Sequence, residues 1–206
     1  MTALVCFVLA ATAIASVFVL YPLILRIMTK VKADRPHVSE VPSEDGLPSV
    51  TVIVAARNAE TLIDAKVRNS QALDYPPQKL SFVFCSDGST DGTADRLHAL
   101  AADDPRITVI VSETHDGKIA AMNRAVSHGQ SDLLLFTDVD ARLAPDSLRS
   151  MVGHYADDRV GGVCGRRIIG EDQESLRAGQ DRHFRFHASL QILESRIGSV
   201  TANEGK

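Results

Sequence analysis

The sequence predicts an α/β domain with a mostly parallel sheet, preceded by one N-terminal transmembrane helix. The first observation is an apolar segment, residues 3–25, that carries no charged side chain. The second is that short β-branched runs alternate with segments of helical spacing between residues 50 and 155. This alternation is typical of parallel sheets whose strands are connected by helices.

The apolar segment is long enough to span a membrane. At 1.5 Å per residue a helix over 3–25 measures about 34 Å, and a hydrocarbon core is about 30 Å thick. The basic residues follow this segment: Arg26, Lys30, Lys32 and Arg35. The positive-inside rule then predicts that the rest of the chain lies on the cytoplasmic side. A cleaved signal peptide is the alternative, which the missing basic n-region and the length of the segment disfavour.

We predict three parts: a transmembrane helix over 1–28, a polar linker over 29–48 and a globular domain over 49–206. The linker contains several prolines and Gly46 and has no apolar periodicity. The expected strands cover 50–55, 80–85, 107–111 and 132–137, with a fifth candidate at 160–164. The expected helices cover 59–73, 90–102, 118–128, 145–155 and 174–197.

Composition narrows the class of protein. The chain of 206 residues has 22 basic and 26 acidic side chains and a net charge of −4. Nothing in this balance indicates a nucleic-acid partner. Three cysteines, Cys6, Cys85 and Cys164, cannot form a closed set of disulfides and lack the spacing of metal ligands. A reducing compartment is the simpler interpretation.

The first two predicted strands end in polar residues. In parallel α/β sheets, ligands bind at the carboxyl ends of the strands. Arg57 and Glu60 follow the first strand, and Asp87 follows the second, before a turn rich in glycine and hydroxyl groups. The structural alternative is helix capping, by Asn58 in the first segment and by Ser89 or Thr90 in the second.

Lys118 is expected to open the helix after the third strand. A cation at a helix N-terminus opposes the helix dipole, so it can serve an anion there, and a diphosphate fits. The alternative is a solvated surface lysine.

The fourth strand ends in Asp138-Val139-Asp140. On an extended backbone, carboxylates two residues apart share a face, and their repulsion is relieved by a divalent cation. Mg²⁺ and Mn²⁺ favour carboxylate oxygens together with phosphate oxygens. Haloacid-dehalogenase-like phosphatases also place such a pair after a strand. Their motif usually lies on the first strand, however, and has Thr or Val where this chain has Arg142.

Taken together and in order, five segments resemble the N-terminal half of a family 2 glycosyltransferase with the GT-A fold, which is Rossmann-like. They are SVTVIVAARNAE, FCSDGSTDGT, HDGKIAAMNRA, LLLFTDVDA and VGGVCGR. The closing LESRIGSVTANEG is similar to a stretch of membrane-bound members. The resemblance runs from Val50 to about Lys206.

The resemblance implies a nucleotide-diphosphate sugar as donor, commonly a UDP-sugar, and Mn²⁺ or Mg²⁺ as cofactor. It implies that Arg57 and Glu60 line the nucleotide pocket and that Asp87 contacts the base. Lys118 would lie near the nucleotide. Asp138 would lie near the ribose and the metal, and Asp140 would bind the metal. The acceptor would be a lipid or a polysaccharide.

The resemblance covers the donor half alone. In inverting members the general base lies well downstream of the paired aspartates, so it is expected beyond Lys206. The chain is therefore expected to be truncated before the acceptor half. We expect solvated helix faces for four acidic residues: Glu171, Asp172, Glu174 and Glu194. The alternative function is a catalytically inactive nucleotide-binding or regulatory module that lacks the acceptor half.

Overall fold

The computed structural model describes residues 1–32, 43–165, 177–198 and 200. The chain divides into two compact units, one made of residues 1–37 with 166–204 and the other chiefly of residues 38–165. Each unit is described in turn.

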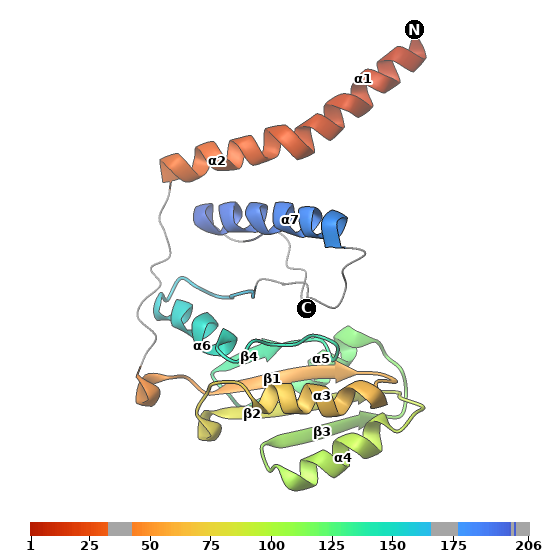
Figure 1. Ribbon diagram of the computed structural model, residues 1–206, viewed down its shortest axis with the longest axis vertical. Helices are drawn as coiled ribbons and strands as arrows, with labels where there is room; N and C mark the ends of the chain where they lie inside the picture. Colours follow the sequence, from red (N-terminus) through yellow and green to blue (C-terminus); the bar gives the residue numbers. More distant parts are fainter. Residues whose placement is uncertain (33–42, 166–176, 199, 201–206) are drawn as a thin grey trace. The chain divides into compact units, whose positions relative to one another are not determined.

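The second unit contains a four-stranded parallel sheet, as predicted. Its strands are β1 (Val50–Ala56), β2 (Leu80–Asp87), β3 (Ile107–Ser112) and β4 (Leu133–Phe136). Their order in the sheet is β3-β2-β1-β4 (Figure 1). Every adjacent pair is parallel. The order runs in opposite directions on the two sides of β1, so the gap between β1 and β4 is the point where α/β sheets characteristically bind ligands.

The expected fifth strand at 160–164 does not form, and this prediction is wrong. Residues 160–164 belong to neither a strand nor a helix. Gly161 and Gly162 are exposed, and no atom lies within 4 Å of the Cβ that either would carry. Two adjacent glycines present no side chain for a sheet to bury, and strand formation depends on that burial.

Helices connect the strands at the expected places. They are α3 (Glu60–Gln71), α4 (Thr93–Asp103) and α5 (Lys118–Val126), and α6 (Ser147–Val152) follows β4. α6 is shorter than expected, because Gly153–Ala156 continue it as a 3-10 turn. Two further 3-10 turns, Glu44–Gly46 and Pro77–Lys79, precede β1 and β2.

The sheet is buried on both faces. Val52 and Val54 of β1 belong to the core cluster that also contains Ile63 of α3. Ile53 belongs to a second cluster, with Ala121 of α5. Successive strand residues point to opposite faces, so α3 and α5 cover opposite sides of the sheet (Figure 1). This explains why β1, apart from Thr51, is apolar throughout rather than alternating.

The first unit begins with one continuous helix. It comprises α1 (Thr2–Ala15), a π-helical turn (Ser16–Leu20) and α2 (Tyr21–Lys32). Thr2–Val31 is the one candidate span in the described part of the chain that is long and apolar enough to cross a membrane. The hydroxyls of Thr12 and Ser16 donate to backbone carbonyls of the same helix, so each hydroxyl has an acceptor within the helix.

This helix continues beyond residue 28, where we expected the linker to begin. Residues 33–42 of the expected linker lie outside the described residues.

The helix α7 (Arg177–Ile197) completes the first unit and agrees with the expected segment 174–197, of which 174–176 lie outside the described residues. The Tyr21 hydroxyl of α2 donates to the Glu194 carboxylate of α7. Glu194 is 8% exposed, so its expected place on a solvated face is wrong. The hydrogen bond from the Tyr21 hydroxyl compensates part of the cost of burying this carboxylate. Glu171, Asp172 and Glu174 lie outside the described residues.

Candidate functional site

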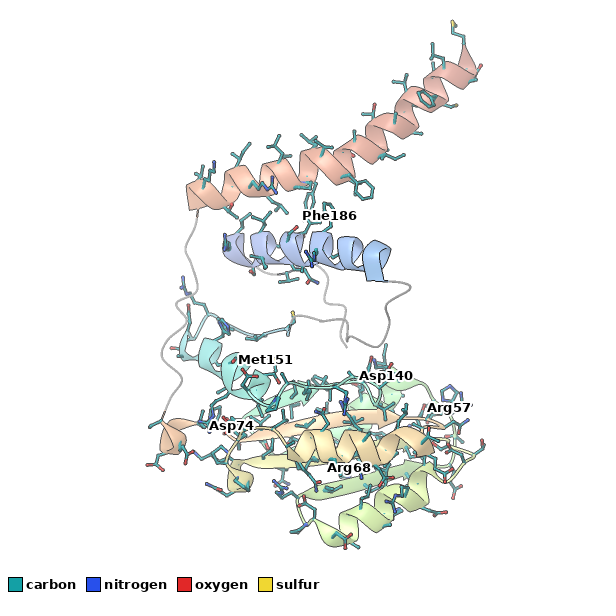
Figure 2. All side chains as sticks on the ribbon, in the orientation of Figure 1. Arg57, Arg68, Asp74, Asp140, Met151 and Phe186 are labelled. Carbon is teal, nitrogen blue, oxygen red and sulfur yellow. The ribbon has the colours of Figure 1, made fainter. Side chains whose placement is uncertain are left out.

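The sequence-predicted residues gather at one edge of the sheet. Arg57 follows β1, Asp87 ends β2, Lys118 opens α5 after β3, and Asp138 follows β4. Figure 2 shows Arg57 and Asp140 at the edge toward which the strands run, with Asp74 at the opposite edge. The parallel order therefore brings four separate sequence segments to the carboxyl edge of one sheet.

The segments after β1 and β2 are joined by hydrogen bonds. Glu60 Oε2 accepts from the Gly92 backbone N–H at 3.1 Å, at the N-terminus of α4. In return, the Glu60 backbone N–H donates to Asp91 Oδ2 at 3.2 Å. Glu60 therefore stabilises the start of α4, where a carboxylate also favours the helix dipole. Glu60 and Arg57 are both exposed, and both remain available to a ligand.

The capping expectations are wrong. The residues at the N-cap positions of α3 and α4 are Ala59 and Gly92. Asn58 has a positive φ of 47°, and its Oδ1 accepts from the Thr90 backbone N–H at 2.8 Å. Asn58 thus links the two loops rather than capping its own helix. Asparagine tolerates this left-handed conformation better than most residues do.

Asp87 organises the loop between β3 and α5. Its side chain is 4% exposed, and it accepts from His115 Nδ1 at 2.7 Å and from the Gly117 N–H at 2.9 Å. Arg124 Nη2 of α5 also donates to it, at 2.9 Å. Burial opposes the charged form, yet the hydrogen bonds from Asp116, His115 and Gly117 hold the pKa of Asp87 below its ordinary value.

Gly88 permits the close approach of this loop. Its φ is +60°, and a Cβ at this position would lie 2.6 Å from the His115 backbone nitrogen. Only a residue without a side chain fits there without displacing backbone. The end of β2 and the loop before α5 are therefore in direct contact. This contact positions the start of α5, where Lys118 lies.

Lys118 and Asp138 meet across the edge of the sheet. The Lys118 ammonium donates to Asp138 Oδ1, although 20 residues separate the two in sequence. The Lys118 side chain is 50% exposed and that of Asp138 is 15% exposed. Asp140 is exposed nearby in sequence, at the end of the same short segment. Lys118 is thus not a merely solvated lysine, because it pairs with the first of the two aspartates.

The sequence analysis missed Lys66, which lies in α3 and is 2% exposed. Its ammonium donates to Thr137 Oγ1 at 2.8 Å and to the Ala141 carbonyl at 2.7 Å, on either side of Asp138 and Asp140. Burial lowers the pKa of Lys66 to about 8, although the charges of Asp138 and Asp140 act to raise it. One sequence signal was present: Lys66 interrupts the apolar face that Ile63 and Val67 mark on this helix.

The donor set fits a divalent cation shared with a substrate. No group of three or more His, Cys, Asp or Glu side chains in the described ranges could hold a metal ion by itself. Asp138 and Asp140 supply two carboxylates at an exposed edge. Mg²⁺-type ions are commonly held by one or two carboxylates, with substrate phosphates and water completing the shell. These residues are therefore suited to a metal that arrives with a diphosphate.

The predicted residues form two groups. Asp87, Lys118 and Asp138 are connected, because Asp87 holds Gly117 and Lys118 pairs with Asp138. Within the described part of the chain, Arg57 and Glu60 form no hydrogen bond or ion pair with these three side chains. Arg57 lies on the loop after β1 and Glu60 begins α3, at the same edge of the sheet.

Comparisons with known proteins identify the family and support the fold. The model of the family described as glycosyl transferase family 2 matches residues 51–202. A mannosyltransferase from Pyrobaculum calidifontis, solved in complex with GDP-Man and Mn²⁺, is 30% identical with a TM-score of 0.69. The alignment covers 90% of this chain and 50% of that one.

Two curated relatives extend the comparison. The beta-monoglucosyldiacylglycerol synthase of Trichormus variabilis is 28% identical over 169 residues, which are 81% of this chain and 36% of that protein. An N-acetylglucosaminyltransferase of Bradyrhizobium elkanii is 30% identical over 130 residues, 63% of this chain and 71% of that protein. The chain thus spans little more than a third of the length of the first of these relatives.

Proposed function

Because the chain belongs to glycosyl transferase family 2, we propose that it is the donor-binding part of a metal-dependent glycosyltransferase. The donor is a nucleotide-diphosphate sugar, for which a UDP-sugar is our first choice. The observation that carries the proposal is the meeting of Lys118 with Asp138, beside Asp140, at the carboxyl edge of the sheet.

Each of these residues has a proposed role toward the diphosphate. Asp138 and Asp140 hold the divalent cation, Mn²⁺ or Mg²⁺, through carboxylate oxygens. Such a cation supplies Lewis-acid stabilisation of a diphosphate leaving group. Lys118 exchanges its partner: its ammonium leaves Asp138 for a phosphate oxygen when the donor binds. A half-exposed side chain can make this exchange without disturbing the core.

The nucleoside occupies the other part of the edge. Arg57 and Glu60 line this pocket, and Asp87 acts near the base. Since Asp87 already accepts hydrogen bonds from its own chain, it shapes the base pocket through the loop that it holds. The mannosyltransferase similar to this chain was solved with GDP-Man, so guanine is the competing base.

The acceptor is a lipid or a polysaccharide, and the chain is anchored in a membrane. One relative is named for glucosyldiacylglycerol synthesis, and another is a poly-beta-1,6-N-acetyl-D-glucosamine synthase of Staphylococcus aureus. The helix Thr2–Val31 supports the anchor. The basic residues that follow its apolar part support a globular unit on the cytoplasmic side.

Calorimetric titration of UDP and of GDP into the full chain in detergent, with and without Mn²⁺, tests the donor site. We expect Mn²⁺-dependent binding of UDP that falls at least about tenfold in Asp140→Asn, because a carboxylate ligand is lost. Asp158→Asn is the matched control, since Asp158 is an exposed aspartate in a turn outside the site. Tighter binding of GDP than of UDP would identify guanine as the base of the donor. Equal Mn²⁺-dependent binding of UDP by the wild type and Asp140→Asn would refute the metal site.

A further inference from the structure

A cavity of about 570 Å³ lies between α2 and α7, within the first unit. Three basic side chains line it: Arg26, Lys30 and Arg196. Three aliphatic side chains line it as well: Leu23, Ile27 and Leu193. Thr29 completes the lining and is 9% exposed. The cavity therefore combines an apolar wall with a concentration of positive charge.

Contacts between α2 and α7 build this cavity. The Tyr21 hydroxyl donates to the buried Glu194 carboxylate, which joins the helices through a polar contact. Phe18 lies in the π-helical turn before α2, and its ring lies 5.7 Å from that of Phe186 of α7 between centroids, which adds an aromatic contact. Figure 2 labels Phe186 on the side of α7 that faces the N-terminal helix. The cavity is thus formed by two helices that are far apart in sequence. The basic residues of α2 form one part of it, and residues of α7 form the other.

The spacing on α2 places charge and apolar surface on one side of the helix. Leu23, Arg26, Ile27 and Lys30 are related by steps of three and four residues, which lie on one helix face. Arg196 approaches from α7. Among the residues that the structure describes, no carboxylate pairs with any of these three cations, and none lines the cavity. The three cations can therefore act together on one anion that enters the cavity.

We propose that this cavity binds the phosphate headgroup of an anionic phospholipid, whose acyl chains follow the apolar surface of α2. The inference rests on the proposed membrane anchor, because the cavity lies where the apolar segment gives way to basic residues. Guanidinium groups bind phosphate oxygens through paired N–H donors, and Lys30 adds a point charge. The bound lipid would fasten α7 to the membrane-proximal end of α2.

Lipid retention by the full chain tests the proposal. The chain is reconstituted in nanodiscs containing equal amounts of phosphatidylglycerol and phosphatidylcholine and is then released for native mass spectrometry. A basic residue near an anionic lipid surface contributes about fivefold in affinity. We therefore expect preferential retention of phosphatidylglycerol by the wild type. The variant Arg26→Gln/Lys30→Gln/Arg196→Gln should lose up to about a hundredfold of that preference.

The matched control is Arg68→Gln/Arg159→Gln/Arg185→Gln, which removes the same charge outside the cavity and should retain the lipid. The single variant Arg196→Gln, in the last turn of α7, should lose about fivefold of the preference for phosphatidylglycerol. It tests the proposal if the triple variant fails to fold. Equal retention of the two lipids by the wild type, or an equal loss in the control variant, would overturn the proposal.

Two further measurements separate the causes of failure. If inorganic phosphate alone displaces phosphatidylglycerol, the occupant is not a lipid. Retention of phosphatidylglycerol in the presence of inorganic phosphate supports a lipid as the occupant. Extraction of the wild type from membranes by alkaline carbonate would show that the anchor has failed, and the lipid site would fail with it. An anchored chain without lipid preference refutes the cavity site but leaves the anchor and the donor site intact.

Discussion

Lys66 illustrates how one side chain can organise the candidate metal site without touching it. Its ammonium is buried, and its two acceptors, Thr137 Oγ1 and the Ala141 carbonyl, lie on either side of the paired aspartates. Holding both acceptors limits the conformations of the segment that carries Asp138 and Asp140. A positive charge at this place also offsets the repulsion between the two carboxylates when no metal is present.

We predict that Lys66→Met weakens Mn²⁺-dependent nucleotide binding by about tenfold, because two charge-assisted hydrogen bonds are lost. The melting temperature should stay close to that of the wild type. Methionine fills a similar volume, and the substitution removes the desolvation cost of a buried charge. Calorimetry and thermal melting of the same samples measure the two effects.

The control for this prediction is Lys79→Met. Lys79 also donates to backbone carbonyls, those of Glu44, Asp45 and Leu47 in the segment before β1. The variant Lys79→Met should therefore lower the stability of the fold and leave nucleotide binding unaltered. Similar binding losses in both variants would argue against a positioning role for Lys66.

At the scale of elements, Asp104 joins three of them. It follows α4, and its carboxylate accepts from Arg106 Nη2 at 2.7 Å, at the entry to β3. It also accepts from Gln71 Nε2 at 2.8 Å, at the end of α3. The hydrogen bonds from Arg106 are the main cause that holds the pKa of Asp104 well below its usual range, with Gln71 contributing and burial opposing.

We predict that Asp104→Asn lowers the free energy of unfolding at pH 7 by about 1–3 kcal/mol. The folded-state pKa of Asp104 is depressed, so its contribution is present above the unfolded-state pKa of about 4 and is lost as the pH falls through the folded-state value. Denaturant unfolding across pH 2–7 should show the difference between variant and wild type shrinking below pH 4. Asp103→Asn, its exposed neighbour, should show neither effect.

In the molecule as a whole, one chain combines an exposed apolar helix with an α/β unit that has a buried core. The described part of α1 has no buried residue, so its apolar side chains are exposed along the whole helix. Exposure of that extent is typical of a helix whose solvent is lipid. The other unit buries its sheet under helices on both faces.

We predict that the chain stays with the membrane fraction after an alkaline carbonate wash, because transfer of this helix to water exposes its apolar surface. Protease added to inside-out vesicles should digest the α/β unit, and protease added to intact spheroplasts should leave it whole. Release by carbonate would contradict the span, and digestion in spheroplasts would contradict the cytoplasmic orientation.

Much of the fold could be predicted from the sequence, because its signals are local. Apolar runs and helical spacing placed the four strands and their connecting helices within a few residues of their observed ends. The candidate fifth strand does not form, because Gly161 and Gly162 have no side chains to bury. The apolar residues beside them in 160–164 had suggested a strand. Of the candidate site, the sequence placed Lys118 at the start of a helix and Asp138 after a strand, but it did not predict their ion pair.

The class of fold, the order of the elements and the residue types near the strand ends follow from the sequence, because periodicity and chain order are local properties. Which of these residues contact one another follows from the packing of the folded chain. Lys66 is separated from Thr137 by 71 residues, and Asp87 from Gly117 by 30. No local pattern encodes contacts across such separations, because they arise when a parallel sheet brings distant strand ends to one edge.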